Sequence, residues 1–518
     1  MKVTLKNELS LQVQPIVQRI VEEQIASRIS KKDSTIWGPD AEQEASIRLG
    51  WVSSPSDSVE LIPAIVQLRD ELSNAGINRF VLCGMGGSSL APEVISRHFK
   101  RDLVILDSTS PDQVRLAIEN ISKTAVVVSS KSGSTVETDS QKRIFEQAFV
   151  EAGIDPTQRI IIVTDPGSPF DQSARSAGYR VFNADATVGG RYSALTAFGL
   201  VPAGLAGCDI SQLLHDARAA MPSLVSDSAD NQAIILAAAL AGMPGVDKFL
   251  IEADVIPSFG DWVEQLVAES TGKEDRGVLP VAVPAQAPEF SAKFDDTISV
   301  RFSNDAADVS FEGSLGELFV LWEYATAIAG WLLRINPFDQ PNVESAKVAA
   351  RKLLDQPTFS NHVDFVDRAI AVTARGYKTT GTTVESAVES LLSQIKSDSY
   401  LAIHAYLPST SYPQFLELRN LFAARLKRPV TFGWGPRFLH STGQYHKGGP
   451  KQGVFLQITQ SIENDLSIPG REFSFGQLIT AQANGDAEVL ADHNLPVLSL
   501  QVFNPLEALE FLKGVIRS

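Results

Sequence analysis

Short apolar runs alternate with helix-like stretches through residues 77–183. Each of the first four runs leads into a polar turn that contains Ser, Gly or Pro. This β–α repetition predicts a parallel sheet with helices on both faces, and ligands of such sheets bind beyond the carboxyl ends of the strands. The turns at that edge are therefore the first candidates for a site. The expected strands are 77–83, 103–106, 125–128, 160–163 and 181–182.

The pattern changes on either side of this block. Residues 1–60 carry apolar residues at roughly helical spacing, which predicts a helical N-terminal segment. A boundary falls near Cys208, and α/β alternation resumes beyond it. We expect three parts: the helical segment 1–60, a first α/β domain at 61–208 and a second at 209–518. Further expected elements are helices at 210–221, 227–243 and 315–333, and strands at 248–253, 278–283, 297–302, 401–407, 430–432, 454–458 and 496–503.

Charge and composition narrow the partners. The chain has 518 residues and a net charge of −16, so neither a nucleic acid nor an anionic membrane is expected as a partner. Cys83 and Cys208 cannot form a disulfide framework and fit a reducing cytoplasm, the expected location. The N-terminus lacks the apolar core of a signal peptide, and the apolar run 233–244 is too short to span a bilayer. No metal-ligand cluster appears, and no cofactor is expected.

The turn after the third strand, residues 129–135 (SSKSGST), combines hydroxyls, a cation and a glycine before a helix-like stretch. Unpaired N–H groups and the positive dipole end of a helix favour an anion there. The alternative is a solvated loop in which Thr135 only caps the helix.

The first strand opens into residues 84–89 (GMGGSS), a near match to a dinucleotide fingerprint, with Asp107 where a ribose-binding acid would stand. Ser89 stands where the fingerprint has its third glycine, which counts against a dinucleotide. Two serine-containing loops at one edge of the sheet instead favour a compact sugar phosphate as the ligand.

The two loops together resemble those of the sugar isomerase (SIS) domain, and three later motifs resemble glucose-6-phosphate isomerases. Residues 187–193 (TVGGRYS) are similar to the family's Gly-Gly-Arg-Tyr/Phe-Ser motif. Residues 268–273 (AESTGK) are similar to its Gly-Glu-Ser-x-Gly-Lys segment, and residues 335–347 (INPFDQPNVESAK) to its Asn-x-Phe-Asp-Gln-x-x-Val-Glu-x-x-Lys signature. The five motifs lie in the family's order over roughly 35–350. The resemblance implies two SIS-type doubly wound α/β domains with mainly parallel sheets.

The resemblance also implies residue roles. Glu269 falls on the catalytic base, whose task favours a pKa raised toward neutrality. Arg191 would stabilise the enediolate and Lys347 would be the catalytic lysine. Glu264, the nearest competitor for the base, sits mid-helix and is expected to be solvated or paired. The expected substrate-binding residues are Gly87, Ser88, Ser130, Lys131, Ser132, Thr135 and Gln340.

One feature departs from the family. Its ring-opening histidine lies between the glutamate and the lysine, yet no histidine occurs between Glu269 and Lys347. His440, in residues 438–444 (FLHSTGQ), stands in a segment similar to the Asp-Leu-His-Ser-x-Gly-Gln of some bacterial members, as if a block had moved in chain order. This arrangement resembles the isomerase half of bifunctional transaldolase/glucose-6-phosphate isomerases. We expect His440 to open the ring, with His446 as its rival.

The resulting expectation is an aldose–ketose isomerase that interconverts glucose 6-phosphate and fructose 6-phosphate without a metal. Alternatives are a non-catalytic SIS-domain sensor of sugar phosphates, added activity on mannose 6-phosphate, and a nicotinamide-dependent dehydrogenase that uses residues 84–89. Related enzymes are commonly dimers in which the partner subunit supplies the histidine. The resemblance therefore implies a homodimer, while the shifted position of His440 leaves its delivery in cis or in trans open.

Overall fold

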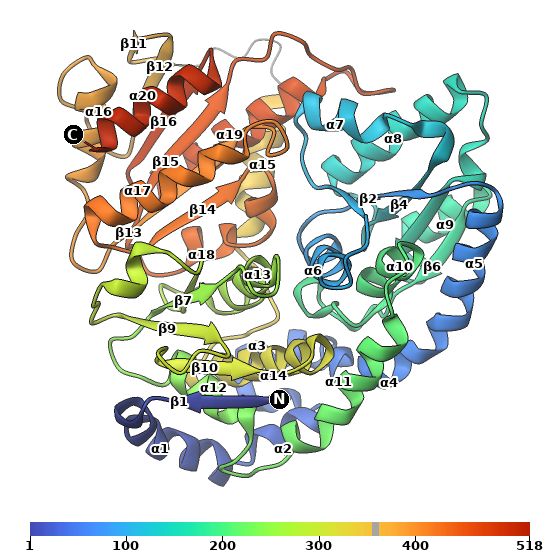
Figure 1. Ribbon diagram of the computed structural model, residues 1–518, viewed down its shortest axis with the longest axis vertical. Helices are drawn as coiled ribbons and strands as arrows, with labels where there is room; N and C mark the ends of the chain where they lie inside the picture. The colour runs from blue at the N-terminus through green and yellow to red at the C-terminus, as the bar shows by residue number, and fades with distance from the viewer. Residues whose placement is uncertain (355–361, 518) are drawn as a thin grey trace.

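The structure is a computed structural model that describes residues 1–354 and 362–517, without the side chains of Val343, Glu344, Ala346 and Lys347. Figure 1 shows one sheet on one side of the molecule and two further sheets, next to each other, on the other side. The predicted mixed α/β class with mainly parallel sheets is confirmed.

The first sheet has the order β3-β2-β4-β5-β6, and all of its strands are parallel. Every residue of β4 is buried, as expected for a parallel strand covered on both faces. The five strands expected between residues 77 and 183 are confirmed. They are β2 (Arg79–Cys83), β3 (Val104–Leu106), β4 (Thr124–Ser129), β5 (Ile160–Thr164) and β6 (Arg180–Asn183).

The second sheet, β1-β10-β9-β7-β8, takes its edge strand from the N-terminus. The segment 1–60 was expected to be helical, and for residues 2–5 this is wrong: β1 (Lys2–Leu5) pairs antiparallel with β10 (Val309–Glu312). Val3 is buried while Lys2 and Thr4 are exposed, which is the alternation of an edge strand. The other strands are β7 (Lys248–Glu252), β8 (Leu279–Val283) and β9 (Thr297–Phe302).

The third sheet, β11-β12-β16-β15-β13-β14, also lies within 209–518, so this segment contains two sheets. Edge strands β8 and β14 lie in contact, and one apolar cluster draws on both sheets. Strands β13 to β16 run parallel, whereas β11 and β12 are antiparallel additions. The strands are β11 (Phe365–Asp367), β12 (Ile370–Arg375), β13 (Tyr400–Tyr406), β14 (Val430–Trp434), β15 (Gly453–Gln460) and β16 (Val497–Val502).

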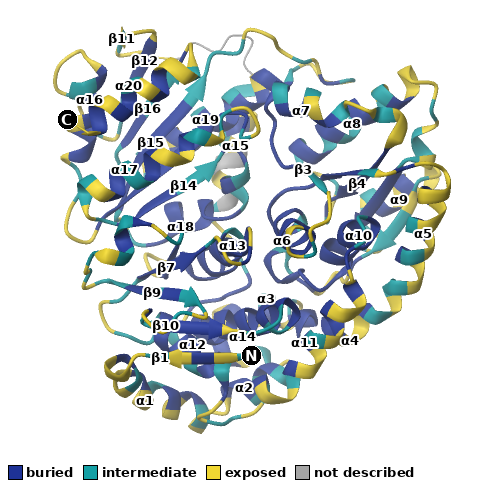
Figure 2. Ribbon diagram, viewed as in Figure 1, coloured by how far each residue is buried: buried dark blue, intermediate teal, exposed yellow. Residues whose placement is uncertain are grey.

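Helices cover the sheets and fill the space between them. Figure 2 shows buried strands and central helices, with exposed outer faces on α1 and α5. None of the helices in the described ranges has the length and apolar character that a membrane span requires. The helices are α1 (Asn7–Glu22), α2 (Ile25–Ser30), α3 (Pro39–Ser46), α4 (Ser54–Asp57), α5 (Ile62–Asn74), α6 (Leu90–His98), α7 (Pro111–Ile118), α8 (Val136–Glu151), α9 (Pro169–Ser176), α10 (Ala197–Leu205), α11 (Ile210–Leu224), α12 (Gln232–Ala241), α13 (Phe259–Thr271), α14 (Leu315–Leu333), α15 (Val343–Leu354), α16 (Val384–Leu392), α17 (Glu417–Leu426), α18 (Gly443–Gly448), α19 (Phe475–Asp492) and α20 (Pro505–Arg517).

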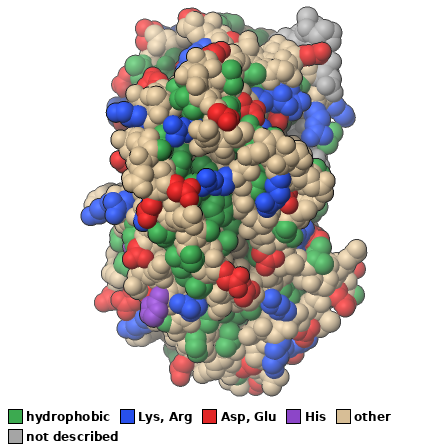
Figure 3. Space-filling view, turned by 90° about the vertical axis from the view of Figure 1, so that its right-hand side faces the viewer, with side chains coloured by type: hydrophobic (Ala, Val, Ile, Leu, Met, Phe, Trp, Pro, Cys, Tyr) green, Lys and Arg blue, Asp and Glu red, His purple; other side chains and the backbone are tan. Residues whose placement is uncertain are grey.

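The surface mixes both signs of charge. Figure 3 shows acidic and basic side chains interspersed over one face of the molecule, with hydrophobic side chains between them. No single sign dominates the described part of that face, so the chain's acidic excess is not concentrated there.

Candidate active site

Three parts of the fold meet at the candidate site. The first sheet contributes the turns that follow β2 and β4, and α13 follows β7 of the second sheet. The third sheet contributes the 3₁₀-helical turn Arg437–His440, which follows β14. Each turn lies past the carboxyl end of a parallel strand, where binding sites of such sheets form.

Glu269 lies in the last turn of α13 with its carboxylate between two donors. The Arg191 guanidinium lies 3.2 Å from Oε1, and Gln265 donates from Nε2 to Oε2 over 3.1 Å. Only 7% of the Glu269 surface is exposed. The Glu269 carboxylate is therefore held in a fixed position beside the Arg191 guanidinium.

His440 lies against the start of α8. Its Nε2 is 2.9 Å from Oε1 of Glu137, whose carboxylate also accepts a hydrogen bond from Gln482 on α19. Gln265 donates a second hydrogen bond to the His440 carbonyl over 2.8 Å, so one amide connects Glu269 with the His440 turn. All of these residues belong to one chain. His440 therefore lies beside Gln265 and Glu137 of its own chain.

Glu137 and Gln265 were not singled out in the sequence. Acidic residues are common in the first turn of a helix because they complement the helix dipole. Glu137 therefore does not stand out in the sequence. Spacing could have identified Gln265, because it precedes Glu269 by one helical turn and both residues lie on the same face of α13.

Arg437 anchors the His440 turn to the rest of the molecule. Its guanidinium lies 3.0 Å from Asp107 and 3.4 Å from Asp261, and it also pairs with Glu93. Burial raises the pKa of Asp107 to about 6 against the opposing effect of Arg437. Asp107, the ribose-binding acid of the dinucleotide alternative, is thus committed to an ion pair with Arg437.

Arg191 uses its whole guanidinium group. Nε donates to Ser270 over 2.8 Å, Nη1 to Gln340 over 2.7 Å, and Nη2 to the carbonyls of Pro337 and Asp339 over 2.8 and 2.9 Å. Together with the Glu269 ion pair, these contacts occupy the donors of an arginine. Arg191 and the expected substrate-binding residue Gln340 are therefore brought together beside Glu269.

Lys273 binds the same turn from the other side. It donates to the carbonyl of Asn336 over 2.7 Å and to the Asp339 carboxylate over 2.5 Å. Burial, with a further contribution from Arg191, lowers the pKa of Lys273 to about 8. Two cations thus hold the turn that carries Gln340.

The turn after β4 presents hydroxyls at the N-terminus of α8. Thr135 is the N-cap residue, yet its side chain makes no capping hydrogen bond, and its Oγ1 lies 3.5 Å from Ser130 Oγ. Ser130 Oγ accepts from the Gly133 N–H over 3.0 Å, and the φ of +75° at Gly133 favours glycine. The Thr135 hydroxyl is thus not used as a simple cap, which was the alternative for this loop.

Lys131 and Ser132 of this turn have partners of their own. Lys131 Nζ donates to the Val188 carbonyl over 2.5 Å and lies 3.2 Å from the Asp165 carboxylate. Burial lowers its pKa, which Asp165 partly offsets. Ser132 is exposed, with its Oγ 2.6 Å from that of Ser134. Lys131 therefore ties the turn to the loop that carries Arg191.

Gly87 shows why the turn after β2 requires glycine. A Cβ at this position would lie 2.0 Å from the Gly190 carbonyl oxygen, so the turns that carry Gly87 and Arg191 touch backbone to backbone. Ser193 Oγ donates to the Gly87 carbonyl over 3.3 Å. Ser88 stands half-buried in the same turn.

Glu264 and His446, the alternatives to Glu269 and His440, have partners outside the candidate site. Glu264 is buried rather than solvated, accepts from the Ala282 N–H over 2.8 Å, and has a pKa raised to about 8 by burial and by Asp261. His446 is buried with Nδ1 2.8 Å from the Tyr400 hydroxyl, and burial followed by His404 lowers its pKa. Lys347 falls in α15, and its side chain lies outside the described residues.

Comparison with known proteins adds a family. The model of the family described as phosphoglucose isomerase matches residues 71–274, which include Arg191 and Glu269. A glucose-6-phosphate isomerase of Thermus thermophilus is 32% identical over 384 residues, covering 60% of this chain and 91% of that protein.

Two solved structures share the fold. A hypothetical protein from Thermus thermophilus aligns with a TM-score of 0.60 and 24% identity over 68% of this chain and all of that one. A glucose-6-phosphate isomerase from Chlamydia trachomatis aligns with a TM-score of 0.53 and 18% identity over 66% of this chain and 86% of its own.

Proposed function

The chain belongs to the phosphoglucose isomerase family, and from that premise we propose that it interconverts glucose 6-phosphate and fructose 6-phosphate. The observation that carries the proposal is the hydrogen-bonded series Glu269–Gln265–His440–Glu137 within one chain. This series links a carboxylate that is suited to proton transfer with an imidazole that is suited to ring opening.

Isomerisation requires one base near C1 and C2 of the open-chain sugar. Glu269 takes the proton from the carbon next to the carbonyl and returns it to the carbonyl carbon, through an enediol. The hydroxyl proton of the first carbon passes to the former carbonyl oxygen, so that the two carbons exchange their oxidation states. Arg191, 3.2 Å from Glu269, supports the negative charge that develops on the enediolate oxygens. Gln340, held by Arg191, contacts the sugar from the same side.

Ring opening moves a proton between the C1 or C2 hydroxyl and the ring oxygen. His440 performs this step as acid and base, and Glu137 orients its ring. Gln482 in turn positions the Glu137 carboxylate. Lys347 joins this step as the family signature implies.

The substrate phosphate binds at the N-terminus of α8. Ser130, Ser132 and Thr135 supply hydroxyl donors beside the unpaired N–H groups of the helix, which favour an anion. Lys131 contributes charge while holding the turn. Gly87 and Ser88 line the sugar side. Because the phosphate is remote from the reacting carbons, these contacts chiefly orient the substrate.

A coupled assay of the purified chain tests the proposal. Fructose 6-phosphate should be converted to glucose 6-phosphate without added metal, as read from reduction of NADP by excess glucose-6-phosphate dehydrogenase. No nicotinamide signal should appear when the coupling enzyme is left out, which separates isomerisation from the dehydrogenase alternative. Binding of the sugar phosphate without turnover would instead support a sensor and overturn the proposal.

A further inference from the structure

A cavity lies on one face of the third sheet. The strands that line it carry polar residues on a face that a helix covers. On β12, β16 and β15, alternate residues point to opposite faces. One set is apolar and packs under α16, α17 and α20, as Val372, Leu456 and Leu500 do. The other set faces α19 and contains Thr373, Gln457, Thr459, Ser499 and Gln501.

The polar residues form two rows across the strands. Gln457 pairs with Ser499, which pairs with Thr373, and the next row joins Thr459 to Gln501. Among the described residues, the side chains of Thr459 and Gln501 make no hydrogen bond within the protein. Thr459 and Gln501 are half-buried, so their polar groups face the cavity. Because a sheet face under a helix is normally apolar, polar rows at this position indicate a ligand that hydrogen-bonds to them.

Two hydroxyls strengthen this inference. Tyr406, next to Thr459 in the same row, is 2% exposed, and its hydroxyl has no partner within the described residues. The hydroxyl of Ser110, at the start of α7, is buried and likewise unpartnered there. Both residues line the cavity. Buried hydroxyls without a partner are costly, and a polar ligand relieves that cost.

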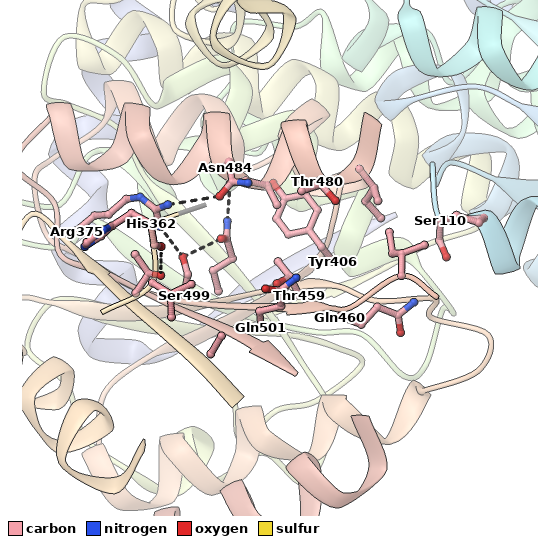
Figure 4. Close-up of a pocket in the computed structure, with 18 residues that line it drawn as sticks. Ser110, His362, Arg375, Tyr406, Thr459, Gln460, Thr480, Asn484, Ser499 and Gln501 are labelled. Carbon is pink, nitrogen blue, oxygen red and sulfur yellow. Dashed lines mark hydrogen bonds between the residues drawn. The ribbon is translucent and has the colours of Figure 1, made fainter. Parts of the chain in front are cut away.

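Arg375 supplies the charge. Its guanidinium donates to Ser499 over 3.2 Å and to Asn484 over 3.4 Å, and no described carboxylate lies within ion-pair distance. Two of its five N–H donors are thus used, by neutral groups. The cavity is partly open to solvent. Figure 4 shows Arg375 and Ser110 at opposite ends of the labelled side chains, with the hydroxyl and amide groups between them.

We propose that this cavity is a second binding site, for a small polyhydroxylated carboxylate of the aldonic acid class. The carboxylate binds the free edge of the Arg375 guanidinium, whose fork matches its two oxygens. The hydroxyl groups of the ligand bind the two polar rows and Tyr406. A single guanidinium balances a carboxylate better than a phosphate dianion. None of the residues that we assign to isomerisation lines the cavity.

Calorimetric titration with gluconate tests the site on the full chain. Gluconate should bind at one site per chain, with the same affinity when glucitol 6-phosphate saturates the isomerase site. Arg375→Met should weaken gluconate binding at least about tenfold, because a hydrogen bond to a charged group is lost. Arg368→Met is the matched control: this exposed arginine lies on the turn before β12, outside the cavity, and the change should leave gluconate affinity unaltered.

A second variant guards against misfolding of Arg375→Met. Gln501 has no described partner, so Gln501→Met should retain full isomerase activity while weakening gluconate binding several-fold. The proposal is overturned if gluconate at millimolar concentration does not bind, if glucitol 6-phosphate displaces it, or if neither cavity variant changes its affinity. Binding of inorganic phosphate that depends on Arg375, without binding of gluconate, would contradict the assigned ligand class.

Discussion

The imidazole of His440 lies 2.9 Å from the carboxylate of Glu137, although 303 positions separate the two residues in the chain. This contact joins the turn after β14 to the first turn of α8, next to the turn that follows β4. Under the proposed roles, one chain contains both the base and the ring opener.

Glu137→Gln should lower turnover of fructose 6-phosphate roughly ten- to a hundredfold, because a hydrogen bond to a charged group contributes about 1.5–3 kcal/mol. The coupled assay measures this loss. Glu151→Gln, an exposed position in the same helix, is the matched control and should retain wild-type turnover. Full activity of Glu137→Gln would show that His440 needs no carboxylate.

Glu269→Gln should keep the fold and the binding of sugar phosphate but lower turnover by about 10²- to 10⁴-fold, because an amide cannot accept the substrate proton. Steady-state kinetics and inhibitor binding separate the two effects. Wild-type turnover in this variant would exclude Glu269 as the base.

Glu264 predicts a pH dependence of stability. Its pKa is raised to about 8 in the folded chain, above the ordinary value of 4.5. Its contribution is therefore fully present below about pH 4.5 and is lost as the pH rises through 8. Glu264→Gln mimics the protonated form, so it should reduce the loss of unfolding free energy between pH 4.5 and 8. Denaturant unfolding at several pH values measures this, and an unchanged slope would contradict the buried, protonated state.

Ser130→Ala combined with Thr135→Ala should weaken inhibition by sugar phosphates. Each hydrogen bond to a charged group that is lost costs about 1.5–3 kcal/mol, chiefly in inhibitor affinity. Ser173→Ala, an exposed serine in the neighbouring helix α9, serves as the control. Unaltered inhibition in the double variant would move the phosphate away from the start of α8.

Regular patterns allowed most of the fold to be predicted. The buried run of β4 and the apolar helix α14 stand out because each is an almost continuous apolar run that is covered on several sides. Strands β1 and β12 escaped prediction because each depends on a partner far away in sequence, β10 and β16 respectively. The division at residue 208 stays a prediction.

The candidate site was only partly visible in the sequence. Motifs indicated Arg191, Glu269 and Gln340, which the structure brings together. Glu137 and Gln265 contact His440 across long separations in the chain, and such contacts leave no local pattern. The polar rows beneath α19 were missed because the alternation of β15 and β16 also suits a sheet with one solvated face.

Complementation between two inactive variants tests the central claim, that one chain supplies both the base and the ring opener. Chains carrying Glu269→Gln and chains carrying His440→Ala are tagged differently, co-expressed and co-purified, and turnover of fructose 6-phosphate is measured. Delivery of His440 in cis predicts that the mixture has no more activity than the residual activities of the two variants. Recovery of a substantial fraction of wild-type turnover would mean that the two residues meet across a subunit interface, and would contradict the account.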